Sequence, residues 1–160
     1  MKQPRNKSRS DIQQDIEKNC VEEVEKLLGI SNLHNDRLLH FKSPYSHTVI
    51  KPDIYSEKDK IIGEVHVHIG NLKTAQVDKI ASDVLKILSF EKNQGEQLRK
   101  IIVVCDEEEE QHLKGKAFIA SAIDMYGIEI VRVQLDSVTK NDLKKAIKDQ
   151  NFYHCSADPS

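Results

Sequence analysis

No apolar stretch in this sequence approaches the roughly 20 residues that a membrane-spanning helix needs. The first ten residues are polar and basic and carry no apolar segment of the kind found in a secretory signal. Cysteine is scarce: Cys20, Cys105 and Cys155 are odd in number and widely spaced, which argues against a disulfide framework. We therefore expect a cytoplasmic protein with no membrane association, in which Cys20 and Cys105 are buried thiols.

Several common functional motifs are also missing. The sequence contains no glycine-rich phosphate loop, no Cys-x-x-Cys pair and no Gly-x-Ser-x-Gly elbow. The net charge is −2 and no basic stripe is visible, which argues against tight binding of duplex nucleic acid. An acidic run at 106–110 precedes a predicted helix, and we expect it to stabilise the start of that helix through the helix dipole.

The 160 residues predict one domain with a substantial core. We expect a flexible basic leader at 1–9, a single domain at 10–150 and a tail at 151–160. Apolar periodicity and turn residues predict a helix from a capping box at Ser10 to Gly29, a short strand near 38–41, a hairpin over 48–69, helices at 74–92, 110–126 and 141–149, and strands at 100–105 and 128–135. This order predicts an α/β fold with a mixed sheet flanked by helices, in which the helix at 74–92 makes a right-handed parallel crossover.

The hairpin carries the strongest functional signal. Its apolar arms, 48–55 and 61–69, flank the polar stretch 57–60. A turn at the middle of this stretch places Asp53 directly opposite Glu64, with Cβ atoms roughly 4.5–5.5 Å apart. Two carboxylates at that distance repel each other unless a positive charge lies between them. Because Mg²⁺ and Mn²⁺ prefer oxygen ligands, the acid pair predicts a divalent metal site.

The same register divides the hairpin into two faces, because successive strand side chains point to opposite sides of the sheet. One face is ionisable and carries Lys51, Asp53, Tyr55, Ile62, Glu64, His66 and His68. The other face is almost entirely apolar and carries Ile50, Pro52, Ile54, Ile61, Gly63, Val65, Val67 and Ile69. The alternative interpretation is a solvent-exposed polar face, which is common in antiparallel hairpins.

Pro52-Asp53, followed on the next strand by Glu64-Val65-His66, resembles the signature of the PD-(D/E)XK phosphodiesterase superfamily. His66 stands where that superfamily usually has a lysine, which is thought to orient or activate the attacking water. Three alternatives follow from this departure. An imidazole does that work, a displaced lysine does it, or the site is no longer catalytic. Lys51, which lies across the hairpin from His66, is the candidate displaced lysine.

Residues 63–91 are also similar to small bacterial members of this superfamily, which share a Glu-Val-His strand, Gly70, Leu72-Lys73 and Gln76. The resemblance covers about residues 47–135 and implies a restriction endonuclease-like core of the order αβββαβ. It further implies that Gln76 is an accessory residue at the start of the following helix. In many relatives a glutamate of the first helix joins the metal site, and Glu17 and Glu23 are the two candidates here.

The leading hypothesis is a Mg²⁺- or Mn²⁺-dependent nuclease-like phosphodiesterase that acts on nucleic acid. Asp53 and Glu64 would hold the metal, His66 or Lys51 would orient or deprotonate the water, and Gln76 would help to position it. One alternative is a catalytically degenerate module on the same fold that binds nucleic acid or a protein partner. Another is a Zn²⁺-dependent hydrolase of small molecules that uses His66 with His68. The resemblance also allows a homodimer.

Overall fold

The computed structural model of the chain describes residues 8–33, 36–42 and 47–155. Its elements are, in chain order, α1 (Arg9–Leu28), β1 (Leu39–His40), β2 (Val49–Ile50), β3 (Ile54–Ser56), β4 (Ile61–His66), α2 (Thr74–Gln94), β5 (Arg99–Val104), α3 (Glu107–Leu113), α4 (Phe118–Met125), β6 (Ile128–Arg132) and α5 (Ser137–Cys155). The first and last helices therefore extend beyond the expected domain limits of 10 and 150. Residues 1–7 of the expected leader and 156–160 of the expected tail lie outside the described residues.

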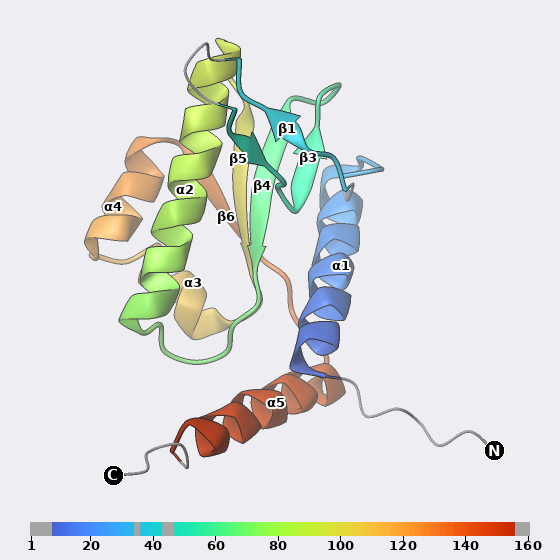
Figure 1. The fold of residues 1–160 in the computed structure, drawn as a ribbon, viewed down its shortest axis with the longest axis vertical. Coiled ribbons are helices and arrows are strands. Elements are labelled where there is room, and N and C mark those ends of the chain that lie inside the picture. Colours follow the sequence, from blue (N-terminus) through green and yellow to red (C-terminus); the bar gives the residue numbers. More distant parts are fainter. Residues whose placement is uncertain (1–7, 34–35, 43–46, 156–160) are drawn as a thin grey trace, which may run out of the picture.

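A mixed four-stranded sheet in the order β3-β4-β5-β6 forms the centre of the fold (Figure 1). β3 pairs antiparallel with β4, whereas β4, β5 and β6 are mutually parallel. β1 and β2 form a separate two-stranded antiparallel sheet. The parallel pairing of β4 with β5 follows from the crossover helix α2 between them. The expected α/β architecture with a mixed sheet flanked by helices is confirmed.

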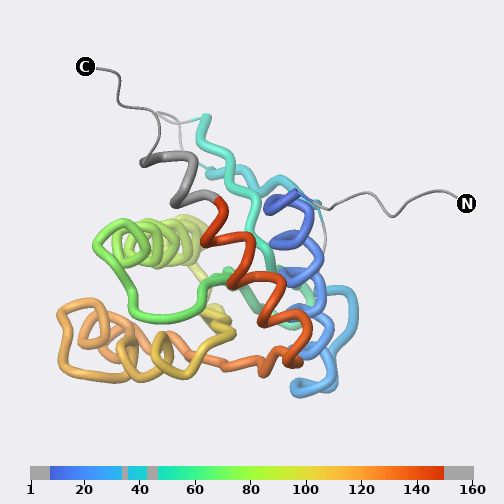
Figure 2. Tube along the Cα trace, turned by 90° about the horizontal axis from the view of Figure 1, so that it is seen from below, coloured from blue at the N-terminus to red at the C-terminus, as the bar shows by residue number. Residues whose placement is uncertain are grey.

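Helices cover both faces of this sheet (Figure 2). Two apolar clusters lie beneath them, one on each face. The cluster under α2, α3 and α4 contains, among others, Tyr55, Ile62, Ile80, Val84, Ile87, Ile102, Val104, Leu113 and Ile123. The cluster under α1 and α5 contains Ile16, Cys20, Val24, Ile54, Ile61, Val65, Ile101, Val103 and Leu143, among others. Neighbouring strand residues such as Ile61 and Ile62 fall in different clusters, as the period of two along a strand requires.

The hairpin register is the predicted one. The paired residues are Ser56 with Ile61, Tyr55 with Ile62 and Ile54 with Gly63. The apolar run at 48–55 is not one strand, however, because residues 51–53 separate β2 from β3. Pro52 lies in this gap and belongs to neither strand. Because proline has no amide N–H to donate, it would interrupt the ladder if it lay within a paired strand.

Three helix boundaries differ from the expectation. Ser8, not Ser10, caps α1, and it forms a capping box with Asp11. The single helix expected at 110–126 is two helices, α3 and α4, separated around Gly115. Glycine is a poor helix former, and the break lets both helices place apolar residues against the same face of the sheet. α5 begins at Ser137 rather than at 141, and Asp136 just before it accepts a hydrogen bond from the Thr139 amide at 2.8 Å, as a helix cap does.

Cys20 and Cys105 are buried thiols, as expected. Burial raises the pKa of each thiol to about 12, so neither is a ready thiolate nucleophile at neutral pH. Among the helices that the structure describes, none is both long and apolar enough to cross a bilayer.

Candidate functional site

The end of the β3–β4 hairpin brings Asp53 and Glu64 together. The Asp53 amide donates to Glu64 Oε2 at 3.4 Å, and the Val65 amide donates to Asp53 Oδ2 at 2.9 Å. The ladder between β3 and β4 ends at Ile54, so the Asp53 carboxylate accepts from a strand amide beyond the last ladder pair. Asp53 is half-buried, whereas Glu64 is only 6% exposed. The solvent-exposed interpretation of this face is therefore wrong for Glu64.

Burial is the largest cause of a raised pKa at Glu64, and the neighbouring Asp53 carboxyl adds to it. Together they raise the pKa of Glu64 to about 8, although the nearby Lys86 ammonium opposes the shift. Glu64 therefore keeps its proton at neutral pH in the metal-free protein. A cation that binds the acid pair would displace this proton.

A lysine does reach Glu64, but it is Lys86 of α2 rather than Lys51. Its ammonium lies 3.1 Å from Glu64 Oε1 and 2.7 Å from Asp83 Oδ1. Asp83 is itself buried, and its other oxygen lies 3.1 Å from the ammonium of Lys79. α2 packs on β4, so the predicted polar face of the hairpin lies beneath this helix.

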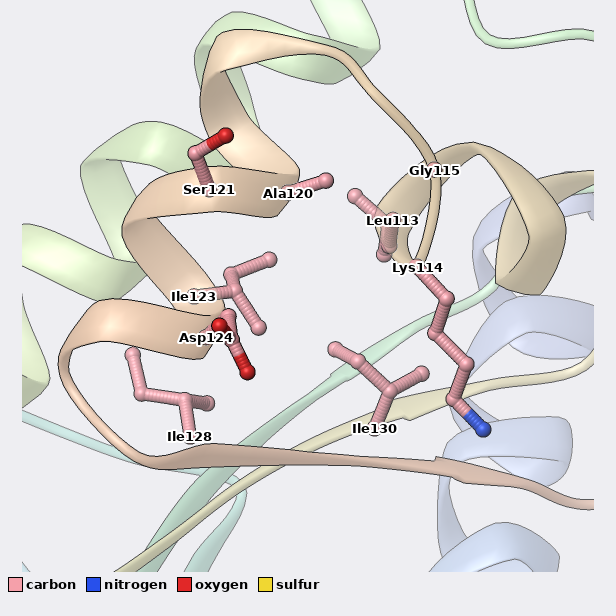
Figure 3. Close-up of a pocket in the computed structure, with 9 residues that line it drawn as sticks. All are labelled: Leu113, Lys114, Gly115, Ala120, Ser121, Ile123, Asp124, Ile128 and Ile130. Carbon is pink, nitrogen blue, oxygen red and sulfur yellow. The ribbon is translucent and has the colours of Figure 1, made fainter.

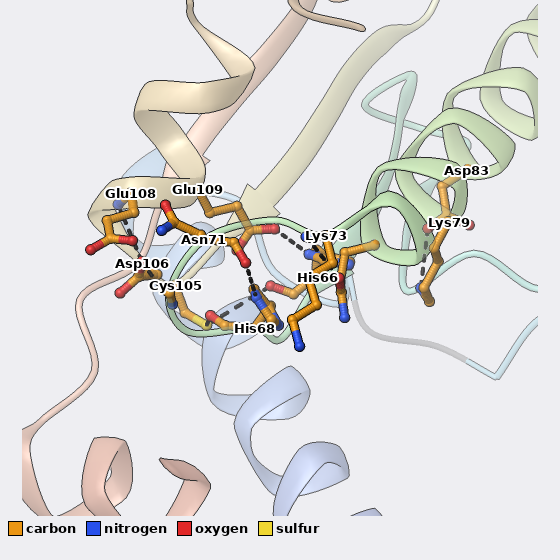
Figure 4. Close-up of polar contacts among 12 residues, drawn as sticks. His66, His68, Asn71, Lys73, Lys79, Asp83, Cys105, Asp106, Glu108 and Glu109 are labelled. Carbon is orange, nitrogen blue, oxygen red and sulfur yellow. Dashed lines mark hydrogen bonds and ion pairs between the residues drawn. The ribbon is translucent and has the colours of Figure 1, made fainter. Parts of the chain in front are cut away.

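The second polar contact on this face joins His66 to Glu109, the fourth acid of the run at 106–110. His66 Nδ1 forms a hydrogen bond with Glu109 Oε1, and Figure 4 shows Glu109 reaching from α3 to the end of β4. His66 is 6% exposed and Glu109 is fully buried. Glu109 Oε2 has no hydrogen-bond partner among the described residues.

Asp106, at the start of the same run, caps α3. Its Oδ2 accepts from the Glu108 amide at 3.2 Å and also from the Gly70 amide at 3.2 Å. The acids therefore stabilise the start of α3, as expected. The expectation was incomplete, because Glu109 turns inward while Glu107 and Glu108 remain exposed.

Three of the predicted accessory residues make other contacts. Lys51 is exposed, and its ammonium lies 2.6 Å from Asp36 Oδ1. Gln76 accepts a hydrogen bond from the Lys73 amide at 2.9 Å, so its side chain caps the start of α2. The glutamates of α1 lie on the helix that covers the opposite face of the sheet from Glu64. Of these two, Glu23 is exposed and pairs with Lys26, and Glu17 is half-buried.

His68 lies beyond the end of β4. Its Nε2 is 3.2 Å from the Asn71 carbonyl, and its ring centroid is 6.1 Å from that of His66 (Figure 4). Over the ranges that the structure covers, no three His, Cys, Asp or Glu side chains are grouped closely enough to hold a metal ion. Two carboxylates still fit Mg²⁺ or Mn²⁺, because Mg²⁺ commonly binds through one or two carboxylates and keeps several waters.

A separate open pocket of about 500 Å³ lies between α3, α4 and β6 (Figure 3). Its wall combines apolar side chains, such as Ile123 and Ile130, with the polar side chains of Lys114, Ser121 and Asp124. It shares no residue with the acid pair or with the contact between His66 and Glu109. The pocket is therefore distinct from the candidate site.

Comparison of the chain with protein-family models, with curated proteins and with solved structures finds no match. The candidate site is therefore described from its geometry alone. It is an acid pair at the end of a buried hairpin, with a lysine from α2 beside it and a histidine–glutamate contact two residues farther along β4. The sequence contains a signal for both Lys86 and Glu109. Asp83 and Lys86 form a polar pair close to the apolar stripe of α2, and Glu109 belongs to an acid run just after a buried strand.

The raised pKa of Glu64 predicts how stability depends on pH. Between pH 4.5, the ordinary value, and about pH 8, the unfolded chain releases a proton that the folded protein retains. The stability contributed by Glu64 is therefore present at low pH and is lost as the pH rises through this window. We expect Glu64→Gln to remove that loss, measured by urea unfolding at about pH 5 and about pH 8. If the free energy of unfolding changed equally with pH in wild type and in Glu64→Gln, the raised pKa of Glu64 would be contradicted. Glu57→Gln, in the exposed turn, is the control.

Proposed function

We propose that this chain is a Mg²⁺- or Mn²⁺-dependent phosphodiesterase that acts on nucleic acid, with a core of the restriction endonuclease-like kind. The observation that carries the proposal is the acid pair, in which Asp53 and Glu64 meet across the end of a hairpin. The order of helix, hairpin, helix and parallel strand supports the proposed core. The match of Pro52-Asp53 and Glu64-Val65-His66 to the superfamily signature supports the proposed chemistry.

Asp53 and Glu64 would hold the metal, with water completing its coordination. When bound, the metal supplies Lewis-acid activation of the phosphodiester and lowers the pKa of a coordinated water. The raised pKa of Glu64 suits this role, because burial and the neighbouring Asp53 carboxyl make its ionisation costly despite Lys86, and a divalent cation would offset that cost. Asp53 is already ordered by the Val65 amide, which fixes one of its oxygens.

In the described part of the chain, the Lys86 ammonium contacts Glu64 of the acid pair, and Lys86 is the displaced lysine of our proposal. Its position beside Glu64 lets it orient a water or stabilise charge that develops on the phosphate. His66 occupies the position of the superfamily's lysine on β4. Gln76 acts indirectly, since its side chain holds the first turn of α2 in place.

The first experiment is calorimetric titration of Mn²⁺ and Mg²⁺ into wild type, Asp53→Ala and Glu64→Ala. We expect wild type to bind and both variants to lose binding, while Asp78→Ala, at an exposed acid on α2, retains it. Unchanged Mn²⁺ affinity in Asp53→Ala would contradict the proposed site. Wild-type binding then justifies a cleavage screen with double-stranded DNA, single-stranded DNA and RNA.

A catalytically degenerate module is the second candidate function, and one contact favours it. The ammonium of Lys86 already lies beside Glu64 and Asp83, so the acids have a counter-charge without a metal. In that case wild type would show no Mn²⁺ binding in the same titration. The protein would then act by binding nucleic acid or a protein partner on this fold.

A further inference from the structure

Glu109 is an unusual residue to find buried at the end of β4. It belongs to the short helix α3, in which Glu107 and Glu108 are exposed, yet its own side chain is fully buried. It lies against the sheet face that also carries Glu64 and His66. Its Oε1 contacts His66 Nδ1, and its Oε2 has no hydrogen-bond partner in the described part of the chain.

The fold alone does not require an acid at this position. A carboxylate removed from water is destabilising unless it is paired and hydrogen-bonded. The apolar cluster under α2, α3 and α4 contains Leu113, which lies one helical turn after Glu109, so an apolar residue at 109 would have an apolar neighbour. The contact with His66 is therefore the feature that explains the acid, and strongly buried ionisable pairs of this kind gather at functional sites.

A carboxylate that contacts one ring nitrogen of histidine determines what the other nitrogen does. The carboxylate accepts a hydrogen bond, so it favours a proton on the nitrogen that it touches. Orienting contacts of this type fix both the tautomer and the direction of an imidazole. In this protein the contacted atom is His66 Nδ1, which leaves Nε2 as the nitrogen that can meet a ligand.

We propose that Glu109 is the positioning residue of the candidate site: it keeps a proton on His66 Nδ1 and thereby presents Nε2 to the water or phosphate beside Glu64. The catalytic part of this inference rests on the proposed phosphodiesterase function. The hydrogen-bonding part does not, because it concerns the metal-free protein. No bond is made or broken by Glu109, whose role is to hold the ring.

The test is long-range ¹H–¹⁵N correlation spectroscopy of the histidine rings in the metal-free protein near neutral pH. We expect the His66 ring in wild type to carry a proton on Nδ1. Glu109→Leu removes the acceptor and keeps an apolar side chain of similar size, so we expect the Nδ1 proton signature to be lost. Glu109→Gln offers an amide oxygen to the same nitrogen and should restore it.

Glu108→Leu is the matched control, since Glu108 is an exposed acid of the same run. It should leave the His66 signals unchanged. A neutral wild-type ring with its proton on Nε2 overturns the inference, and this result needs no variant. An unchanged His66 signature in folded Glu109→Leu also overturns it.

The outcome is separable from the fate of the proposed function. An absence of Mn²⁺ binding in wild type would contradict the proposed phosphodiesterase function. The ring measurement would still test the contact between Glu109 and His66. Conversely, a His66 ring protonated only on Nε2 would remove the role of Glu109 even if Asp53 and Glu64 bind metal. With both results positive, Glu109→Leu should reduce cleavage by about 10²-fold or more, within the range for a misplaced catalytic group.

Discussion

Gly63→Ala is expected to unfold the protein or to destabilise it by about 3 kcal/mol or more, at the upper end of the cost of overpacking. A Cβ atom at this position would lie 2.5 Å from the Ile101 carbonyl oxygen. The obstacle is backbone in β5, so no side-chain rotation can relieve it. Urea unfolding monitored by circular dichroism measures the effect.

The sign of this effect is informative, because strand preference alone predicts the opposite. Replacing glycine by alanine inside an unobstructed strand stabilises by about 0.5–1 kcal/mol. A stabilised Gly63→Ala would therefore show that β4 and β5 are farther apart than in this structure. Ser82→Ala, at an exposed position of α2, should be close to neutral and serves as the control.

Lys86→Met is expected to abolish most cleavage, by about 10²-fold or more, while Mn²⁺ binding persists. The ammonium contacts Glu64 and Asp83, and its loss removes a cation without removing either acid. Methionine preserves the length of the apolar stem, so the packing of α2 on β4 should change little. The measurements are calorimetric Mn²⁺ affinity and the rate of phosphodiester cleavage on the same preparation.

Lys79→Met is the matched control for this variant. Lys79 also pairs with Asp83, but its side chain is more exposed and forms no ion pair with Glu64 in the described part of the chain. We expect Lys79→Met to cleave at a rate close to that of wild type. Equal activity in Lys86→Met would show that Lys86 is only a counter-charge for the buried acids.

The hairpin could be predicted in detail because its information is local. The turn at 57–60 fixes the register, and the register places Asp53 beside Glu64. The α/β architecture was also predictable, since each strand and helix has its own apolar period. The break between α3 and α4 could not be predicted, because the apolar pattern continues across Gly115. Packing on the sheet decides whether the helix also continues there.

The partners of the acid pair could not be predicted in the same way. Lys86 contacts Glu64 only because α2 docks on β4 in a particular rotation. Glu109 contacts His66 only because α3 turns one of several neighbouring acids inward. Strand alternation made Lys51 a reasonable candidate. The ladder between β3 and β4 begins only at Ile54, however, so strand pairing does not hold the Lys51 side chain over β4.

The contacts of the candidate site also differ in the length of chain that each must close. Asp53 and Glu64 are 11 residues apart, Glu64 and Lys86 are 22 apart, and His66 and Glu109 are 43 apart. The entropy of loop closure favours the shortest first, so the two acids meet while they are still hydrated. Their dehydration comes only when α2 and α3 dock. Closing this part of the fold is therefore opposed by the cost of dehydrating its acids, which lowers the free energy needed to separate these helices briefly from β4.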